Sequence, residues 1–300
     1  MKYTLRQLQV FLATAQHNNI SQAANDLHLS QSAASSALKE LESQMGVQLF
    51  DRAGKRLKLN DQGKLLRPKV ESLLCQAEEL ENNLMTHAKA GPITVGATLT
   101  IGNYLAVDIM SQYMVDDPAA RVTLEVANTK TIAEKVKNFE LDIGLVEGEI
   151  HDADLEIQTW MEDELVAFCA PSHPLAGKSH LTDDDIVEQT WIIREYGSGT
   201  RQAFDIAMHG LIPNLQMMEL QHTEAIKRAV AANLGVGCLS LFTLQEDFER
   251  GYLQPLSIPH RDFSRYFYFI LHKNKYRSSG INRWLTLCNK TSEKLNGKKL

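Results

Sequence analysis

Residues 20–45, ISQAANDLHLSQSAASSALKELESQM, constrain the fold of this chain more than any other stretch. The segment predicts two short helices joined by a tight polar turn, because apolar residues recur at helical spacing on either side of that turn. Ser21 is a candidate N-cap for the first helix and Ser30 for the second, since a serine hydroxyl can accept a hydrogen bond from a free backbone N–H group. Each helix has one apolar face, so the pair forms a compact hairpin with one buried side.

The opposite face of the second helix carries small or slender polar side chains. Such a surface can enter the major groove of DNA and offer hydrogen bonds to base edges. An ordinary helical hairpin with a solvated face is the alternative that this pattern alone leaves open. The candidate DNA-contacting residues of the two helices are Ser21, Gln31, Ser32, Ser35, Ser36 and Lys39.

The segments on either side of the hairpin favour the DNA-binding interpretation. Upstream, residues 4–16 predict a helix that opens with a capping box of Thr4 and Gln7. Downstream, Gly46 ends the second hairpin helix, and residues 52–58 predict a short basic β-hairpin. Three helices and a basic ribbon make a winged helix-turn-helix. The wing residues expected to contact phosphates are Arg52, Lys55 and Arg56.

The charge is distributed unevenly along the chain. The whole sequence carries a net charge of −6, whereas residues 1–69 carry 10 Lys/Arg against 5 Asp/Glu, a net of +5. A basic block at one end of an acidic protein suits a local contact with nucleic acid rather than general polyanion binding.

Targeting and redox signals are lacking in the sequence. No apolar run approaches the roughly 18 residues that span a bilayer, and Met1 leads directly into a polar amphipathic helix rather than a signal peptide. We therefore expect a cytoplasmic protein. The four cysteines have no C-x-x-C spacing, which predicts reduced thiols and no metal site. They are Cys75, Cys169, Cys238 and Cys288.

Residues 61–90 predict one long helix with a narrow apolar seam. Its apolar residues are separated alternately by four and three positions, which is a heptad pattern. A seam this narrow on a long helix needs a partner helix, so the pattern predicts a dimer. Packing of the helix on its own domain is the alternative. The seam residues are Leu66, Val70, Leu73, Ala77, Leu80 and Leu84.

From residue 91 onward, strand patterns alternate with helix patterns. This alternation predicts an α/β fold with largely parallel sheets, although one domain or two lobes would give the same pattern. The predicted strands are 93–97, 122–126, 143–146, 165–170, 191–193, 236–241 and 267–271, and the predicted helices include 102–114, 132–138, 200–208 and 224–232.

The same region contains no convincing catalytic constellation. The Gly197-Ser198-Gly199-Thr200 segment is not the G-x-S-x-G pattern of a nucleophile elbow. The Gly235-Val236-Gly237 segment lacks the third glycine of a dinucleotide-binding fingerprint. We therefore predict that the protein is not an enzyme and has no cofactor, with an α/β enzyme as the remote alternative.

Three strand-to-helix junctions carry hydroxyl groups that could bind a small ligand. Helix N-termini and nearby hydroxyls are common ligand contacts in the crevice of an open α/β sheet. Thr and Ser are also ordinary N-caps, which is the alternative at each junction. Glu147 follows a predicted strand and would project into the same crevice. The candidate ligand-binding residues are Thr98, Thr100, Glu147, Ser198, Gly199, Thr200 and Thr223.

The sequence resembles the LysR-type transcriptional regulators of bacteria. The resemblance is long and ungapped, and it is carried by LRQLQVFLATAQHNNISQAANDLHLSQSAASSALKELESQMGVQLFDRAGKRLKLNDQGKLL, residues 5–66. Family members often have Pro where Ser32 stands and a basic residue where Ser36 stands. Base preference and phosphate contacts at these two positions therefore stay open.

The resemblance implies an α/β fold class with an N-terminal winged helix-turn-helix, a long linker helix and a two-lobed, periplasmic-binding-protein-like effector domain. It implies a homodimer or homotetramer on double-stranded DNA, with RNA polymerase as a candidate partner. Segments near 162–164 and 264–267 would form the hinge between lobes. The predicted boundaries are 1–60 for the DNA-binding domain, 61–90 for the linker and dimerisation helix, and 91–300 for the effector domain, with lobe 1 at 91–163 plus 268–300 and lobe 2 at 164–267.

The resemblance also implies that a small-molecule effector binds between the lobes. The segments ATLTIGNYL, DIGLVEGEI, REYGSGTR and EAIKRAV look most similar to the branch tied to sulfur metabolism, which implies a sulfur oxyanion such as sulfite. Helix ends and hydroxyls favour an anion, whereas an ionised Glu147 would repel one unless it shares a proton or pairs with a base such as Arg201. The alternatives are an amino-acid-like or carboxylate metabolite, and a non-regulatory architectural DNA-binding protein.

Overall fold

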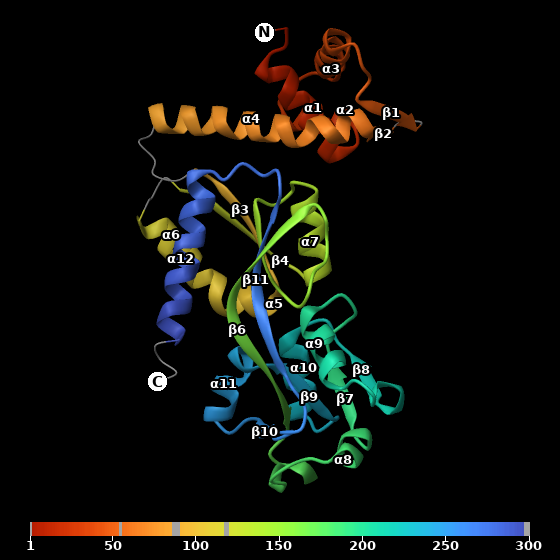
Figure 1. The fold of residues 1–300 in the computed structure, drawn as a ribbon, viewed down its shortest axis with the longest axis vertical. Helices are drawn as coiled ribbons and strands as arrows, with labels where there is room; N and C mark the ends of the chain where they lie inside the picture. Colours follow the sequence, from red (N-terminus) through yellow and green to blue (C-terminus); the bar gives the residue numbers. More distant parts are fainter. Residues whose placement is uncertain (1, 54–55, 86–90, 117–119, 297–300) are drawn as a thin grey trace. The chain divides into compact units, whose positions relative to one another are not determined.

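The chain forms two compact units in the computed structural model, which describes residues 2–53, 56–85, 91–116 and 120–296. The first unit comprises Met1–Gly91 and Lys273–Asn282, and the second comprises Pro92–His272 and Arg283–Leu300 (Figure 1). None of the helices in these described ranges is long and apolar enough to cross a membrane.

Three short helices form the core of the first unit. They are α1 (Leu5–His17), α2 (Ile20–Asp26) and α3 (Gln31–Met45). The predicted capping box of Thr4 and Gln7 is confirmed, and Ser30 caps α3 as expected. The predicted cap of α2 is wrong. Asn19, not Ser21, caps that helix, because its side-chain oxygen accepts hydrogen bonds from the backbone N–H groups of the next two residues.

The predicted wing is a two-stranded antiparallel ribbon. Strands β1 (Phe50–Ala53) and β2 (Arg56–Leu59) pair with Phe50 opposite Leu59. Phe50 is buried and its ring lies 5.6 Å from that of Phe11 in α1, so the base of the wing is fixed to the helical core.

Helix α4 (Asp61–Met85) follows the wing. Asn60 caps it by accepting a hydrogen bond from the Gly63 N–H at 2.9 Å. Val70 is buried in the core of the first unit, so the start of the predicted seam packs on its own unit, as the alternative proposed. Leu73 and Leu80 are 39% and 61% exposed, and they leave an apolar strip uncovered. Residues 86–90 of the predicted linker lie outside the described residues.

The second unit is built on one mixed sheet whose strand order is β4-β3-β5-β11-β6-β9-β7-β8, with β10 paired to β6. Two groups of three parallel strands are joined by long antiparallel strands, so the prediction of largely parallel sheets holds only within the two groups. The strands are β3 (Ile93–Ala97), β4 (Val122–Val126), β5 (Ile143–Glu147), β6 (Leu155–Cys169), β7 (Thr190–Ile193), β8 (Gln216–Glu219), β9 (Val236–Ser240), β10 (Gln254–Leu256) and β11 (Ser264–His272).

Helices cover the faces of this sheet (Figure 1). The predicted helix at 102–114 is interrupted, because a π-helical turn at Gly102–Ala106 separates two α-helical parts. The helices are α5 (Leu99–Ile101), α6 (Val107–Asp116), α7 (Thr129–Lys137), α8 (Asp183–Val187), α9 (Gly199–Ala207), α10 (Thr223–Ala231), α11 (Leu241–Glu249) and α12 (Ser279–Asn296).

The second unit has two lobes, each with its own apolar core. The first lobe contains β3, β4, β5 and α7, with Ile132 and Val146 in its core. The second lobe contains β7, β8, β9 and α9, with Trp191 and Phe204 in its core. Strands β6 and β11 run through both lobes (Figure 1). The two-lobed α/β arrangement is therefore present, and loops that follow the strands of each lobe face one another.

The four cysteines form no disulfides. Cys169, Cys238 and Cys288 are buried, and burial raises the pKa of each thiol, to about 11 for Cys169. Because the thiolate is the reactive form, these three buried thiols are chemically inert.

Candidate functional site

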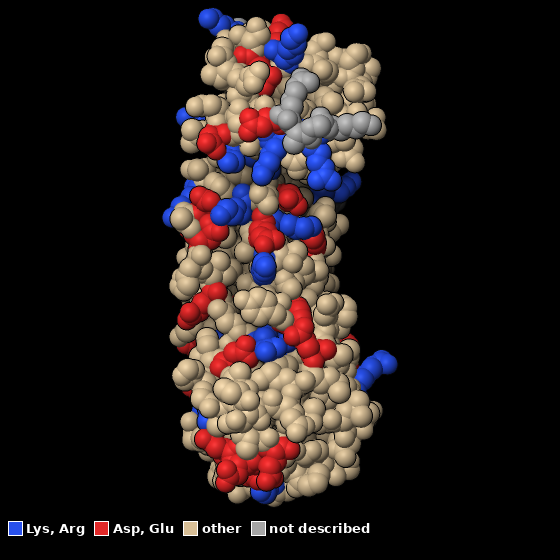
Figure 2. All heavy atoms as spheres, turned by 90° about the vertical axis from the view of Figure 1, so that its right-hand side faces the viewer, with Lys and Arg blue, Asp and Glu red and all other residues tan. Residues whose placement is uncertain are grey.

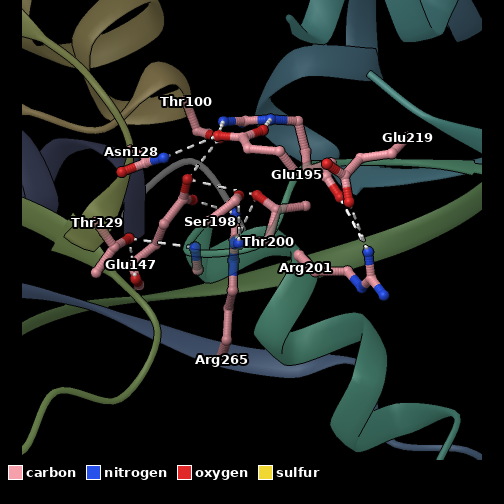
Figure 3. Close-up of polar contacts among 12 residues, drawn as sticks. Thr100, Asn128, Thr129, Glu147, Glu195, Ser198, Thr200, Arg201, Glu219 and Arg265 are labelled. Carbon is pink, nitrogen blue, oxygen red and sulfur yellow. Dashed lines mark hydrogen bonds and ion pairs between the residues drawn. The ribbon is translucent and has the colours of Figure 1, made fainter. Parts of the chain in front are cut away.

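A buried charged network lies where the two lobes of the second unit meet (Figure 3). Arg265 on β11 is buried between Glu147 at the end of β5 and Asp163 on β6. Its Nη2 lies 2.5 Å from Glu147 Oε2, an ion pair without the alignment of a hydrogen bond. Its Nε lies 2.6 Å from Asp163 Oδ2, and the Ser240 hydroxyl donates to the other oxygen of Asp163 at 2.7 Å. One guanidinium thus bridges two buried carboxylates.

The Glu147 carboxylate also accepts hydrogen bonds from both lobes. The hydroxyls of Thr100 in α5 and Thr200 in α9 each lie 3.4 Å from Glu147 Oε1. Arg265 Nη1 donates to the Thr200 oxygen at 3.1 Å. Thr98, which precedes α5, is buried, and its hydroxyl has no hydrogen-bond partner among the described residues. The buried site therefore combines several hydroxyl donors with one fixed cation.

The backbones of the two lobes touch at Gly199, the first residue of α9. Its N–H donates to the Thr129 hydroxyl at 3.2 Å, and that hydroxyl donates to the carbonyl oxygen of Glu147 at 2.8 Å. A Cβ atom placed on Gly199 would lie 1.9 Å from the same carbonyl oxygen. Only glycine permits this approach, so the lobes are closed on each other at this point.

A second polar contact crosses from lobe to lobe beside the first. Asn128 Nδ2 donates to Glu195 Oε1 at 3.2 Å, and Arg194 holds both oxygens of Glu195 at 2.8 and 2.9 Å. Burial by itself would raise the pKa of Glu195, but the hydrogen bonds from Arg194 outweigh burial and lower that pKa. Glu195 is thus kept ionised at the lobe interface.

The structure brings some of the predicted ligand-binding residues together and leaves others out. Thr100, Glu147 and Thr200 share one network, and Gly199 joins it through the backbone. The Ser198 hydroxyl caps α9 by accepting from the Thr200 N–H, which is the ordinary role that the sequence left open. Thr223 is buried at the start of α10, and none of the hydrogen bonds of this network involves it.

The expected base partner of Glu147 was wrong. Arg201 pairs with Asp205 at 2.8 Å and with Glu219 at 3.4 Å, whereas Arg265 holds Glu147. A signal for Arg265 exists in the sequence, because side chains alternate along a strand. Arg265 is in phase with buried Phe267 on β11, and an arginine on the buried face of a strand calls for a buried anionic partner.

In the first unit, five of the predicted DNA-contacting side chains share one exposed surface. The polar residues predicted on α3 are all exposed, and a groove of about 480 Å³ is lined by Ser21, Gln31, Ser35, Lys39 and Arg56. Ser32 Oγ lies 3.0 Å from the capping hydroxyl of Ser30. Arg52 stands in β1, whereas Lys55 lies outside the described residues. Helix α3 and the wing therefore contribute jointly to this surface.

Comparison with known protein families identifies both parts of the chain. Residues 5–64 match the bacterial regulatory helix-turn-helix proteins of the lysR family, and residues 86–292 match the LysR substrate binding domain. The chain is a LysR-type transcriptional regulator. Regulators of these families are not enzymes, so the alternatives of an α/β enzyme and of a purely architectural protein are set aside. The second unit of this LysR-type regulator is its effector domain.

Individual relatives agree with this assignment. The uncharacterised HTH-type transcriptional regulator YeiE of Escherichia coli is 40% identical over 289 residues, covering 96% of this chain and 98% of the relative. CysL of Bacillus subtilis is 29% identical over 273 residues, covering 90% and 86%. The full-length structure of OxyR from Pseudomonas aeruginosa has a TM-score of 0.73 at 21% identity and covers 96% and 95%, which shows a shared fold.

The matched effector domain takes a small molecule rather than a resident cofactor. No group of three or more His, Cys, Asp or Glu side chains in the described part of the chain could hold a metal ion.

Proposed function

We propose that this regulator binds inverted half-sites in promoter DNA as a homodimer or homotetramer, and that an effector in the lobe interface changes the affinity for DNA. The observation that carries the DNA part is the shared exposure of the polar residues of α3 beside Arg56 of the wing. Two-fold symmetry would place two such surfaces on successive turns of the duplex. RNA polymerase is the proposed downstream partner.

We propose domain boundaries at 1–60, 61–90 and 91–300. The end of the first unit's main segment at Gly91 supports the second boundary. For the lobes, we propose 91–163 plus 268–300 and 164–267. The change of partner along β6 supports this division, since Glu164 pairs with β11 and Leu165 pairs with β9.

The DNA surface gives a first prediction. Arg56→Ala should weaken binding to all sequences and lower the salt slope by about 1, because a phosphate contact releases about one counterion. Gln31→Ala should instead change base preference, by about 1–3 kcal/mol at one position, because a side chain on α3 would read a base edge. Binding measured against a set of operator variants at several salt concentrations separates the two effects.

Glu40→Gln is the control for this prediction, since Glu40 is exposed on α3 but does not line the groove. This variant should keep the wild-type sequence preference. Weaker binding by Gln31→Ala with the sequence preference of the wild type would remove Gln31 from base readout.

We propose that the effector is a small sulfur oxyanion such as sulfite, bound between the lobes. The Glu147 carboxylate is bound by the hydroxyls of Thr100 and Thr200 and by the Arg265 guanidinium. An oxyanion offers the same kind of acceptor atoms to these donors. The buried, unpartnered hydroxyl of Thr98 adds a further donor. The relationship to CysL supports the sulfur assignment. For an amino-acid-like effector, an amine on Glu147 would first have to displace Arg265.

The effector changes the regulator only if it prefers one arrangement of the lobes. Gly199, Thr200 and Ser198 come from the second lobe, whereas Thr98, Thr100 and Glu147 come from the first. A ligand that bridges these two sets would favour the closed arrangement and thereby alter DNA binding.

The charge of Glu147 gives a second prediction. Glu147→Gln should tighten binding of the oxyanion by about tenfold, equivalent to about 1.4 kcal/mol, because a like charge is removed and Arg265 is released. Arg265→Gln should weaken binding by at least as much. Calorimetric titration of each variant with sulfite, sulfate, thiosulfate and O-acetylserine measures both changes.

Glu219→Gln is the matched control, because it removes one negative charge from the pair with Arg201 on the surface. It should leave the affinity unchanged. Binding of none of the four probes by the wild type would remove the sulfur assignment. Equal oxyanion affinity in wild type and Glu147→Gln would remove Glu147 from the site while leaving the lobe interface as the effector site.

A further inference from the structure

An open cavity of about 650 Å³ lies on the flank of the effector domain, and we refer to it as the flank cavity. The first lobe contributes α7 and the loop 149–152, and the second lobe contributes residues 196–209. It borders the lobe contact, because Thr129, Ser198 and Gly199 are among its lining residues, but none of Thr98, Thr100, Glu147 and Arg265 lines it. Its volume lies within the range of small-molecule sites, about 300–1,000 Å³.

Most charged side chains of the flank cavity already have partners. Lys137 pairs with Asp152 at 2.9 Å and with Asp154 at 3.1 Å. Arg201 pairs with Asp205 at 2.8 Å. Figure 2 shows that Lys and Arg side chains intermingle with Asp and Glu on the side of the effector domain where α7 lies. The cavity therefore has no general preference for one sign of charge.

Two charged side chains on α7 remain available to a ligand in the flank cavity. Lys130 and Glu134 are exposed on α7, and neither side chain makes an ion pair or hydrogen bond with any described residue. Residues four positions apart on a helix are neighbours, with Cβ atoms about 5–6 Å apart. A cation and an anion thus stand side by side at the cavity without satisfying each other.

The remaining lining of the flank cavity is partly apolar. Tyr196 is 83% exposed and Ile206 is 59% exposed, both in the second lobe, and Ala133 and Ile150 line the cavity from the first lobe. Exposed apolar side chains grouped in a hollow are typical of a binding surface. An apolar ligand group can therefore contact both lobes here.

We propose that the flank cavity binds a free amino acid with an apolar side chain. The ligand carboxylate pairs with Lys130, its ammonium group pairs with Glu134, and its side chain packs against Tyr196 and Ile206. A simple anion would leave Glu134 facing a like charge, and a simple cation would do the same to Lys130. A zwitterion satisfies both, and an α-amino acid carries its two charges on one carbon.

The flank cavity is a second ligand site beside the proposed oxyanion site in the buried network, and Ser198 and Gly199 lie at the border of the two. Because its lining comes from both lobes, an amino acid bound there favours the closed arrangement that the network also holds. The amino acid thus acts as a co-effector. Its affinity and the affinity of the oxyanion are coupled, because both ligands favour the same arrangement of the lobes.

The test is calorimetric titration of the full-length protein with L-leucine and L-methionine. Lys130→Gln and Glu134→Gln should each weaken binding by about tenfold or more, because each removes a charge-assisted contact. Lys135→Gln is the matched control, since Lys135 lies on the same helix, pairs with Glu125 and does not line the cavity. It should bind both amino acids as the wild type does.

Ligand analogues make the assignment of each contact specific. N-acetyl-leucine lacks the ammonium group, so its affinity should not change in Glu134→Gln. Leucinamide lacks the carboxylate, so its affinity should not change in Lys130→Gln. Matched deletions on protein and ligand form a double-mutant cycle, which isolates each pairwise contact.

Several outcomes would overturn the flank cavity as an amino-acid site. One is that neither amino acid binds the wild type, and another is that both variants bind with wild-type affinity. Loss of amino-acid binding in Arg265→Gln alone would place the ligand in the buried network instead. Sulfite titrations of the same variants keep the two sites distinct, because a failed amino-acid titration leaves the oxyanion proposal untouched.

Discussion

A regulator carrying Leu73→Glu and Leu80→Glu is expected to lose dimerisation through its N-terminal half and, with it, most of its affinity for a two-half-site operator. Both leucines are exposed on α4, whereas Val70 and Leu74 are buried in the core of their own unit. The exposed leucines occupy heptad positions, where a partner helix would cover them. Four glutamates at such a seam would repel and would be costly to bury.

The expected loss of DNA affinity is large because the two half-sites would then bind independently. Linking two binding modules raises overall affinity by roughly 10²–10⁴-fold through effective concentration. The double variant forfeits that gain although no residue that contacts DNA has changed. Its affinity for a single half-site should equal that of the wild type.

Sedimentation of the 1–90 fragment and operator titration of the full chain measure the two effects. Leu65→Glu is the matched control, because Leu65 is 69% exposed at the start of the same helix but outside the heptad positions. This control should remain dimeric. A wild-type fragment that sediments as a monomer would count against the seam, as would a double variant that sediments as a dimer.

The first unit could be predicted closely because its signals are local. Helix α3 begins directly after Ser30 and ends at Gly46, which has a φ of +73°, as the capping pattern predicts. The cap of α2 was misplaced because Asn19 and Ser21 are both good capping residues two positions apart. Which one caps the helix depends on where the preceding turn ends, and the sequence does not specify this.

Several strands of the effector domain could not be predicted from the apolar pattern of the sequence. Strand β6 was expected at 165–170 but begins at Leu155, because residues 156–159 are exposed and Ile157 is the one apolar residue among them, which gives only a weak apolar signal. Strands β8 and β10 were not predicted, since both are short and largely exposed. Pairing partners rather than composition define these segments as strands.

The buried network was only half predictable for a related reason. Thr100, Glu147 and Thr200 stand at strand–helix junctions, which local patterns reveal. Asp163 and Arg265 are 102 residues apart in the chain and meet only because β6 and β11 pair. The sequence indicated that Glu147 needs a basic partner, but only the tertiary structure identifies that partner as Arg265.

Replacing Gly199 by alanine should hold the two lobes apart and reduce the affinity for a lobe-bridging effector by at least about tenfold. The new methyl group would lie 1.9 Å from the carbonyl oxygen of Glu147 and 2.9 Å from its Cγ. A backbone carbonyl at the end of a central strand cannot rotate away, because its strand is paired on both sides by β3 and β11. Separation of the lobes therefore relieves the strain. The substitution destabilises the closed arrangement by about 1–3 kcal/mol, as in other overpacked sites.

Separation of the lobes would have several measurable consequences. The bond from the Gly199 N–H to the Thr129 hydroxyl would break, and Thr200 would move away from Glu147. We expect faster amide exchange at the start of α9 and a lower unfolding temperature. Effector titration of the operator complex should lose its effect, since the ligand no longer gains contacts in both lobes. DNA binding without effector should persist, because the winged helix-turn-helix is unchanged.

Gly177→Ala tests whether this response belongs to the lobe contact or to any Gly-to-Ala change. Gly177 lies in the same lobe, and a Cβ added there meets nothing within 4 Å. The control should keep the unfolding temperature, amide exchange and effector response of the wild type. If Gly199→Ala behaves in the same way, then the approach of α9 to the end of β5 does not hold the lobes closed. If only Gly199→Ala loses the effector response, closure at this glycine is the step that connects the effector to DNA.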